Sequence, residues 1–244
     1  MQYLSRMNNS ACSQNFCVEV RLHYSMSKPS TAAQAQSMSL GAAIKQWAEK
    51  NSDKKIEDES IIKLNCTTPP MDRIDNTVNQ FINCVKLSLS TNMIDKIPLL
   101  PGSCLPKLRT LSLGRNQIKK ITGLEEVGAT LTELWISYNQ ITALDGLSCC
   151  TKLETLYISN NKIKEVSELK KLTLSNPVLN NCNFVGNPLY EGFASRTEAR
   201  LVVLRTVPQI KTLDGELFTG FSESDRTSTP SDQRPPSHRT AIPA

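Results

Sequence analysis

Side chains that could carry out catalysis or hold a metal are few and scattered along this 244-residue chain. Its two histidines, His23 and His238, lie near opposite ends, so the predicted folded region has no histidine base to activate a serine or cysteine. The eight cysteines form no Cys-x-x-Cys pair, and no phosphate-binding glycine loop or EF-hand spacing is present. The sequence therefore predicts a protein that is not an enzyme and that uses no metal or cofactor.

The cysteines indicate packing rather than chemistry. Cys84 and Cys182 stand at positions where the surrounding pattern has leucine, and a free cysteine behaves there as a small apolar residue. Cys149 and Cys150 are adjacent and are also expected to be packed thiols. Such scattered cysteines are more typical of a reducing compartment than of a disulfide framework.

Aromatic and charged residues suit binding better than catalysis. Tryptophan, tyrosine and arginine dominate the binding energy of protein–protein contacts. One candidate set combines three aromatic residues with two charged ones, and comprises Trp135, Tyr157, Tyr138, Arg115 and Glu133. A second set is basic and lies near the end of the folded region: Arg196, Arg200, Arg205 and Lys211.

A repeated phrase positions the first set. The pattern Leu-x-x-Leu-x-Leu-x-x-Asn-x-Leu occurs five times between Cys84 and Leu189, with cysteine replacing leucine twice. This is the leucine-rich-repeat phrase, whose period is about 20–29 residues. Its asparagines lie 24, 23, 22 and 26 residues apart, at Asn92, Asn116, Asn139, Asn161 and Asn187. The predicted fold is an α/β leucine-rich-repeat solenoid, with parallel strands on one face and a helical cap at each end.

The same phrase separates buried from exposed positions. Its leucines alternate with period two, as on a strand with one buried face. The asparagines leave the strand at the turn, where an amide can both donate and accept, so we expect them to form a structural ladder. Trp135 and Tyr157 then occupy equivalent outward positions in neighbouring repeats. They form either a binding patch or ordinary scattered surface aromatics.

The flanking segments predict caps and extensions. Residues 1–37 are expected to be a flexible extension, 38–60 a helical cap, 61–215 the repeat domain with its terminal helix, and 216–244 a disordered Ser/Pro-rich tail. Leu40, Ala43, Ile44, Trp47 and Ala48 recur at helical spacing. Ser195 and Glu198 form a capping box before a second helix, whose inward residues we expect to be Leu201, Val202 and Leu204.

Charge and hydropathy restrict the class of partner. The formal net charge is +5, which favours an acidic protein surface but is too small to indicate nucleic acid. No segment is long and apolar enough for a signal peptide or membrane span, so we expect a soluble intracellular protein. The basic second set forms either a solvated helix face or a second contact for an acidic partner.

Between residues 38 and 215 the amino-acid sequence resembles that of one family. The segments IKQWAEK, KLSLSTNMIDKI, LWISYNQI, FVGNPL and PQIKTLDG are similar to the axonemal dynein light chain 1 family, the leucine-rich-repeat light chains of the outer dynein arm. The resemblance implies a non-enzymatic subunit that docks on the heavy-chain motor unit near its microtubule-binding region and tunes ciliary or flagellar beating. It further implies a location in the cytoplasm and cytoskeleton, in the axoneme of a cilium or flagellum.

The resemblance also assigns partners to the two residue sets. Trp135, Tyr157 and their neighbours would meet the heavy chain, and the basic terminal helix would lie near tubulin. Two alternatives remain open at this point: a scaffold subunit of a nuclear ribonucleoprotein, and a regulator of a protein phosphatase. The first would be favoured by a run of basic residues for nuclear import, and the second by more repeats with an acidic groove.

Overall fold

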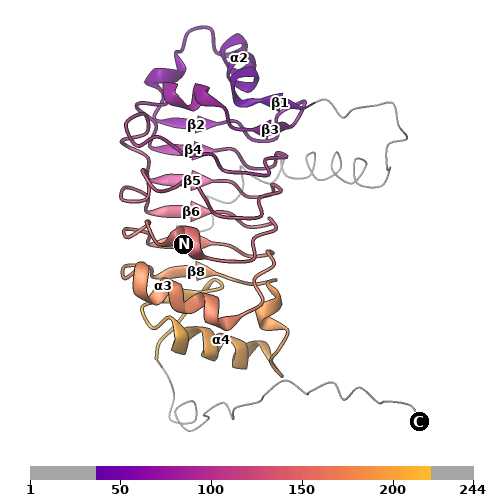
Figure 1. The fold of residues 1–244 in the computed structure, drawn as a ribbon, viewed down its shortest axis with the longest axis vertical. Helices are drawn as coiled ribbons and strands as arrows, with labels where there is room; N and C mark the ends of the chain where they lie inside the picture. The colour runs from indigo at the N-terminus through magenta and orange to yellow at the C-terminus, as the bar shows by residue number, and fades with distance from the viewer. Residues whose placement is uncertain (1–36, 221–244) are drawn as a thin grey trace, which may run out of the picture.

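The computed structural model describes residues 37–220, which form a solenoid of stacked strands with a helix at each end (Figure 1). The predicted architecture, an α/β repeat solenoid with parallel strands and two helical caps, is confirmed. The expected extension up to residue 36 and the tail from residue 221, with His23 and His238, lie outside the described residues. Within residues 37–220, no helix has the length and apolar character needed to cross a membrane.

The strands form two sheets. Eight strands line up in the order β10-β9-β8-β7-β6-β5-β4-β2, all parallel except the β9–β10 pair, and β1 pairs with β3 in a second parallel sheet. The strands are β1 (Met38–Ser39), β2 (Ile61–Lys63), β3 (Met71–Arg73), β4 (Lys86–Ser88), β5 (Thr110–Ser112), β6 (Glu133–Trp135), β7 (Thr155–Tyr157), β8 (Asn181–Asn183), β9 (Thr212–Leu213) and β10 (Glu216–Leu217). The helices are α2 (Leu40–Lys50), α3 (Leu169–Ser175) and α4 (Arg196–Thr206), with short 3₁₀ turns η1 (Ile56–Asp58), η2 (Asn76–Gln80), η3 (Asp145–Leu147), η4 (Val166–Glu168) and η5 (Pro188–Tyr190).

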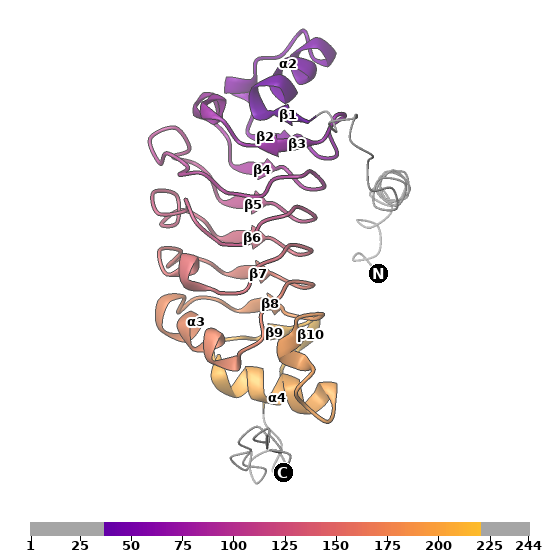
Figure 2. The same cartoon turned by 45° about the vertical axis from the view of Figure 1, so that its right-hand side comes forward.

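Each repeat contributes one three-residue strand whose central side chain enters the core. Burying each such residue stabilises the fold by roughly 1.5–3 kcal/mol. Successive repeats stack along the solenoid (Figure 2). The central side chains therefore form one continuous core. The central residues, all at most 1% exposed, are Ile62, Leu87, Leu111, Leu134, Leu156 and Cys182.

Helix α2 closes the first end of this core. Its N-cap residue is Ser39, whose hydroxyl accepts a hydrogen bond from the Ala42 backbone N–H at 3.5 Å. Trp47 is partly buried and packs against the core as a cap residue. Ala48, which recurs at the same helical spacing, is exposed instead. The residues that α2 buries fully are Leu40, Ala43 and Ile44.

Helix α4 closes the other end. The Ser195 hydroxyl accepts from the Glu198 backbone N–H at 3.1 Å, as the capping box predicts, while the Glu198 carboxylate accepts from the Ala194 N–H rather than from Ser195. The expected inward set was partly wrong. Leu201 and Val202 are only half-buried, because the helix turns a different face to the core. Its buried residues are Ala199, Val203 and Leu204.

The folded domain extends past the expected boundary at residue 215. Strand β10 pairs with β9 after the turn at Asp214 and Gly215, and Phe218 packs against the core. The Phe218 backbone N–H donates to Lys211 O at 2.7 Å. The start of the expected tail is therefore part of the terminal cap, and the prediction of disorder from residue 216 was wrong for residues 216–218.

Candidate protein-binding face

A ladder of asparagines holds the turns that frame the open face of the sheet. In each repeat the amide nitrogen of the asparagine donates to two buried carbonyls, and its oxygen accepts from a backbone N–H in the preceding repeat. Asn139 Nδ2 donates to Leu113 O and Ile136 O at 3.0 Å each, and Asn139 Oδ1 accepts from Ile118 N at 3.0 Å. Equivalent bonds recur at the other buried ladder members, Asn92, Asn116, Asn161 and Asn187.

Neighbouring asparagines share their carbonyl partners. Leu113 O accepts from both Asn116 and Asn139, and Ile136 O accepts from both Asn139 and Asn161. A carbonyl has two lone pairs, so both bonds can form at once. The ladder therefore fixes the spacing of adjacent repeats and holds the turn residues that precede each asparagine.

Those preceding residues adopt left-handed backbone conformations. Arg115 has φ of 55° and Tyr138 has φ of 58°. Residues other than glycine or asparagine rarely adopt this conformation, and the two following repeats use Asn160 and Gly186 at this position. The chain thus retains bulky side chains where the turn favours small ones, and both are exposed beside the sheet.

The outward row of the sheet contains the predicted aromatic pair. The strand register aligns Ser112 with Trp135, and Trp135 with Tyr157. The two rings are 5.6 Å apart between centroids and tilted by 33°, within the range for a favourable aromatic pair. Trp135 is 37% exposed, and the Tyr157 hydroxyl accepts from Asn181 Nδ2 at 3.2 Å. We name Trp135, Tyr157, Tyr138, Arg115 and Glu133 the aromatic patch.

A cationic side chain lies over each of two rings in the aromatic patch. Lys86 Nζ lies 4.9 Å from the centroid of Trp135, and Arg115 Cζ lies 4.3 Å from the centroid of Tyr138. Such cation–π contacts contribute about 0.5–1 kcal/mol at exposed sites. Glu133 occupies the other outward position of β6 and is half-buried. The aromatic patch is thus a pre-arranged group of rings and charges, open to a partner.

The basic set near α4 does not lie on one surface. Arg196 and Lys211 are exposed, and Arg205 is half-buried in the last turn of α4. Arg200 instead turns into the fold: its Nη1 donates to Leu213 O at 2.7 Å, and its Nη2 lies 3.1 Å from a Glu216 carboxylate oxygen. With its side chain only 13% exposed, Arg200 is not part of an exposed basic surface, which corrects the sequence-based grouping.

Arg200 belongs to a cluster that ends the sheet. The backbone N–H of Phe184 would bond to the next strand, but it donates to Asp214 Oδ1 at 2.8 Å instead. Asp214 Oδ2 accepts from the Tyr190 hydroxyl at 2.6 Å and lies 3.8 Å from Arg200 Nη1. Burial, together with this hydrogen bond, raises the pKa of the Tyr190 phenol. The carboxylate of Asp214 therefore replaces the carbonyl that a further repeat would supply.

Four cysteines, Cys84, Cys149, Cys150 and Cys182, pack into the core or against it, whereas Cys66 is exposed. Cys84 and Cys182 are fully buried, and burial raises the pKa of the Cys84 thiol to about 11. The sulfurs of Cys149 and Cys150 lie 3.8 Å apart, and burial raises the pKa of Cys150. Among residues 37–220 no group of three His, Cys, Asp or Glu side chains could hold a metal ion.

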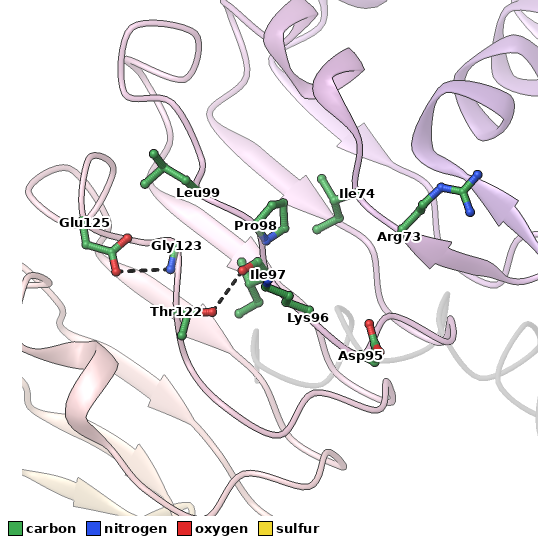
Figure 3. A pocket seen from close by; sticks show the side chains of 10 residues that line it. All are labelled: Arg73, Ile74, Asp95, Lys96, Ile97, Pro98, Leu99, Thr122, Gly123 and Glu125. Carbon is green, nitrogen blue, oxygen red and sulfur yellow. Dashed lines mark hydrogen bonds between the residues drawn. The ribbon is translucent and has the colours of Figure 1, made fainter.

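A hollow on the surface is lined by residues that do not belong to the aromatic patch (Figure 3). Thr122 Oγ1 donates to Ile97 O at 3.0 Å, and the Gly123 N–H donates to Glu125 Oε1 at 3.3 Å. A side chain at Gly123 would lie 2.0 Å from Pro98 O, so the loops that form the hollow pack closely. Its lining mixes both charge signs with apolar groups: Arg73, Ile74, Asp95, Lys96, Ile97, Pro98, Leu99, Thr122, Gly123 and Glu125.

Two residues of the face were not assigned a role from the sequence. The repeat pattern predicts an outward position for Lys86, but its reach across β5 to Trp135 depends on a side-chain rotamer that the pattern does not specify. Ile61 lies on β2, before the five repeats of the motif, and is 52% exposed. The signal that could have revealed Ile61 is an apolar residue at an outward position of a strand.

Comparison with known proteins identifies similar chains. The model of the family described as "Leucine Rich repeats (2 copies)" matches residues 82–126 and 129–171. "Dynein axonemal light chain 1" of Danio rerio is 43% identical over 181 residues, covering 74% of this chain and 92% of that protein. The Homo sapiens protein of that name is 43% identical and covers 78% and 99%, and the Chlamydomonas reinhardtii protein is 41% identical and covers 74% and 91%.

Proposed function

Because this chain belongs to the dynein axonemal light chain 1 family, we propose that it docks on the heavy-chain motor unit of an outer-arm axonemal dynein through its sheet face. It acts there as a non-catalytic subunit, in the axoneme of a cilium or flagellum. The relatives carry the name of an axonemal light chain, which favours this function over a ribonucleoprotein scaffold or a phosphatase regulator.

One observation supports the sheet face as the docking surface. Trp135 and Tyr157 lie in register on adjacent strands, at the centre of an open parallel sheet, and neither ring is needed to fill the core. Clusters of tryptophan, tyrosine and arginine are typical of the small group of residues that dominates a protein–protein interface. The aromatic patch combines such residues with backbone positions that the asparagine ladder holds in place.

A second contact involves the cap. Arg196, at the start of α4, and Lys211, after its end, are exposed, and Arg205 is half-buried in the last turn of the helix. We include them in the proposal as a contact for the acidic surface of tubulin, without Arg200, whose guanidinium is held by Leu213 O and Glu216. By contacting both the motor and its track, the light chain would regulate beating at the microtubule-binding region of the motor.

The proposal is tested by affinity purification of the tagged full-length chain from ciliated cells, with partners identified by mass spectrometry. We expect an outer-arm dynein heavy chain as the dominant partner, and its loss when Trp135→Ala and Tyr157→Ala are combined. Leu174→Ala provides the control, because Leu174 is an exposed apolar residue on α3, outside the sheet. Recovery of spliceosomal or phosphatase partners without a dynein would contradict the proposal and leave the fold intact.

A further inference from the structure

The sheet face has a second apolar contact at its first end. Ile61 points outward from β2 and is 52% exposed, and Val85 beside it is 37% exposed. The Val85 backbone N–H donates to Ser60 O at 2.8 Å, which places Val85 next to the residue preceding Ile61. Exposed β-branched residues at this edge contribute nothing to the core, so a partner would gain by covering them.

The distance between the two contacts is set by the strand order. Ile61 lies on β2 and Trp135 lies on β6, with β4 and β5 between them. Three strand-to-strand steps of about 4.8 Å each bring Ile61 level with Glu133, and Trp135 lies two residues, about 7 Å, further along β6, so the two residues are about 16 Å apart. A helix rises about 1.5 Å per residue, so residues about eleven positions apart on one helix match this separation.

The face between the two contacts is positively charged. Lys63 and Lys86 project from β2 and β4, and Glu133 is the only acidic residue among the outward positions of β2 and of β4 to β8. Lys86 extends from β4 toward Trp135, which places its ammonium group on the path that links the two contacts. Within residues 37–220 neither lysine forms an ion pair with an acidic side chain. Acidic side chains of a partner would therefore meet cations without breaking an existing pair.

The main chain offers little to a partner on this face. Strands β4 to β8 are each hydrogen-bonded to a neighbour on both sides, so no free strand edge is available between Lys86 and Tyr157. Side chains must then provide the contact. An amphipathic helix presents side chains at regular spacing without needing a strand partner.

From these observations we infer that the partner segment on this face is an amphipathic helix that crosses the strands from β6 and β7 to β2. It places one apolar side chain on Trp135 and Tyr157, a second about eleven residues away on Ile61 and Val85, and acidic side chains facing Lys86 and Lys63. This inference rests on the proposed function, because it describes the partner at the same sheet face.

The experiment measures the dissociation constant of the full-length chain for a recombinant outer-arm heavy-chain motor fragment, at several salt concentrations. Ile61→Glu is expected to weaken binding about tenfold or more, as for loss of an interface anchor. Lys63→Glu is expected to weaken binding about threefold or more and to reduce its salt dependence, because an attractive charge pair is lost. Thermal melting of each variant verifies that the fold is intact.

Matched variants outside the face serve as controls. Leu174→Glu introduces the same charge at an apolar residue that is 86% exposed on α3, and Lys119→Glu reverses an exposed lysine outside the strands. If Trp135→Ala weakens binding but Ile61→Glu binds like Leu174→Glu, the inference is overturned and the proposed function survives. If Lys63→Glu binds like Lys119→Glu, the acidic helix is overturned. If Trp135→Ala has no effect either, both the inference and the proposed docking face fail.

Discussion

Replacement of Asn139 by alanine tests the asparagine ladder at a single backbone group. Asn139 Nδ2 donates to Leu113 O and Ile136 O, but each of these carbonyls keeps a second donor, from Asn116 at 2.9 Å and Asn161 at 3.1 Å. The Ile118 N–H has no such replacement. It donates only to Asn139 Oδ1, at 3.0 Å and in the buried interior.

The expected loss of stability follows from this one unsatisfied N–H group. Leaving one buried donor unsatisfied costs about 1–3 kcal/mol. For a domain of this size, each kcal/mol shifts the melting midpoint by roughly 2–4 °C. We therefore expect Asn139→Ala to lower the midpoint by about 4–8 °C for a loss of about 2 kcal/mol. Binding to the heavy-chain motor fragment at saturating protein should stay unchanged, because Asn139 is buried behind the face.

Thermal melting followed by circular dichroism measures the loss, and amide hydrogen exchange locates it. Exchange at the Ile118 N–H should accelerate, while exchange at the equivalent Ile141 N–H, which is held by Asn161, should change less. Gln140→Ala is the matched control, because this neighbouring side chain makes no hydrogen bond within residues 37–220. An unchanged melting midpoint, or unchanged exchange at Ile118, would refute the ladder argument.

Three further predictions concern other parts of the fold. Tyr138→Asn should weaken heavy-chain binding about fivefold, because it removes a residue of the aromatic patch. It should not lower the free energy of unfolding, because asparagine tolerates the left-handed turn. A drop in the free energy of unfolding would contradict this. Arg200→Ala should lower the free energy of unfolding in urea by about 3 kcal/mol, because it leaves the buried Asp214 carboxylate without its cation. Arg196→Ala, at an exposed position, should lower it by less than about 0.5 kcal/mol. Equal losses for the two variants would contradict the role of Arg200 in the cap. Burial raises the pKa of Cys84 from 9.0 to about 11. The native thiol should therefore resist alkylation at pH 8 and become reactive as the pH approaches 11. Fast labelling of Cys84 at pH 8, measured by mass spectrometry, would contradict this.

The repeat pattern predicted the register of the sheet well. Because one leucine of each repeat must enter the core, its neighbours are forced outward, and the repeat pattern alone predicts that Trp135 and Tyr157 lie side by side. The ladder asparagines were located in the same way. Period and polarity are enough here, since every repeat satisfies the same local constraints.

Features that depend on the ends of the chain could not be predicted. The sequence shows Arg200 as one of several basic residues on a helix, but its direction depends on Asp214 and Glu216, which approach only after the terminal turn. The helical spacing allowed several inward faces for α4, and packing selected the one with Val203. No sequence pattern predicts the pairing of β1 with β3, because both segments are short and lie outside the repeats.

The central claim is that the heavy chain binds at the aromatic patch. The most direct test is a titration of the full-length chain with an outer-arm heavy-chain motor fragment, comparing the native protein with Trp135→Ala and with the control Leu174→Ala. A loss of about 2 kcal/mol, or roughly 30-fold in the dissociation constant, is expected for Trp135→Ala alone, with its melting midpoint preserved. Equal affinity of the native protein and both variants would contradict the claim.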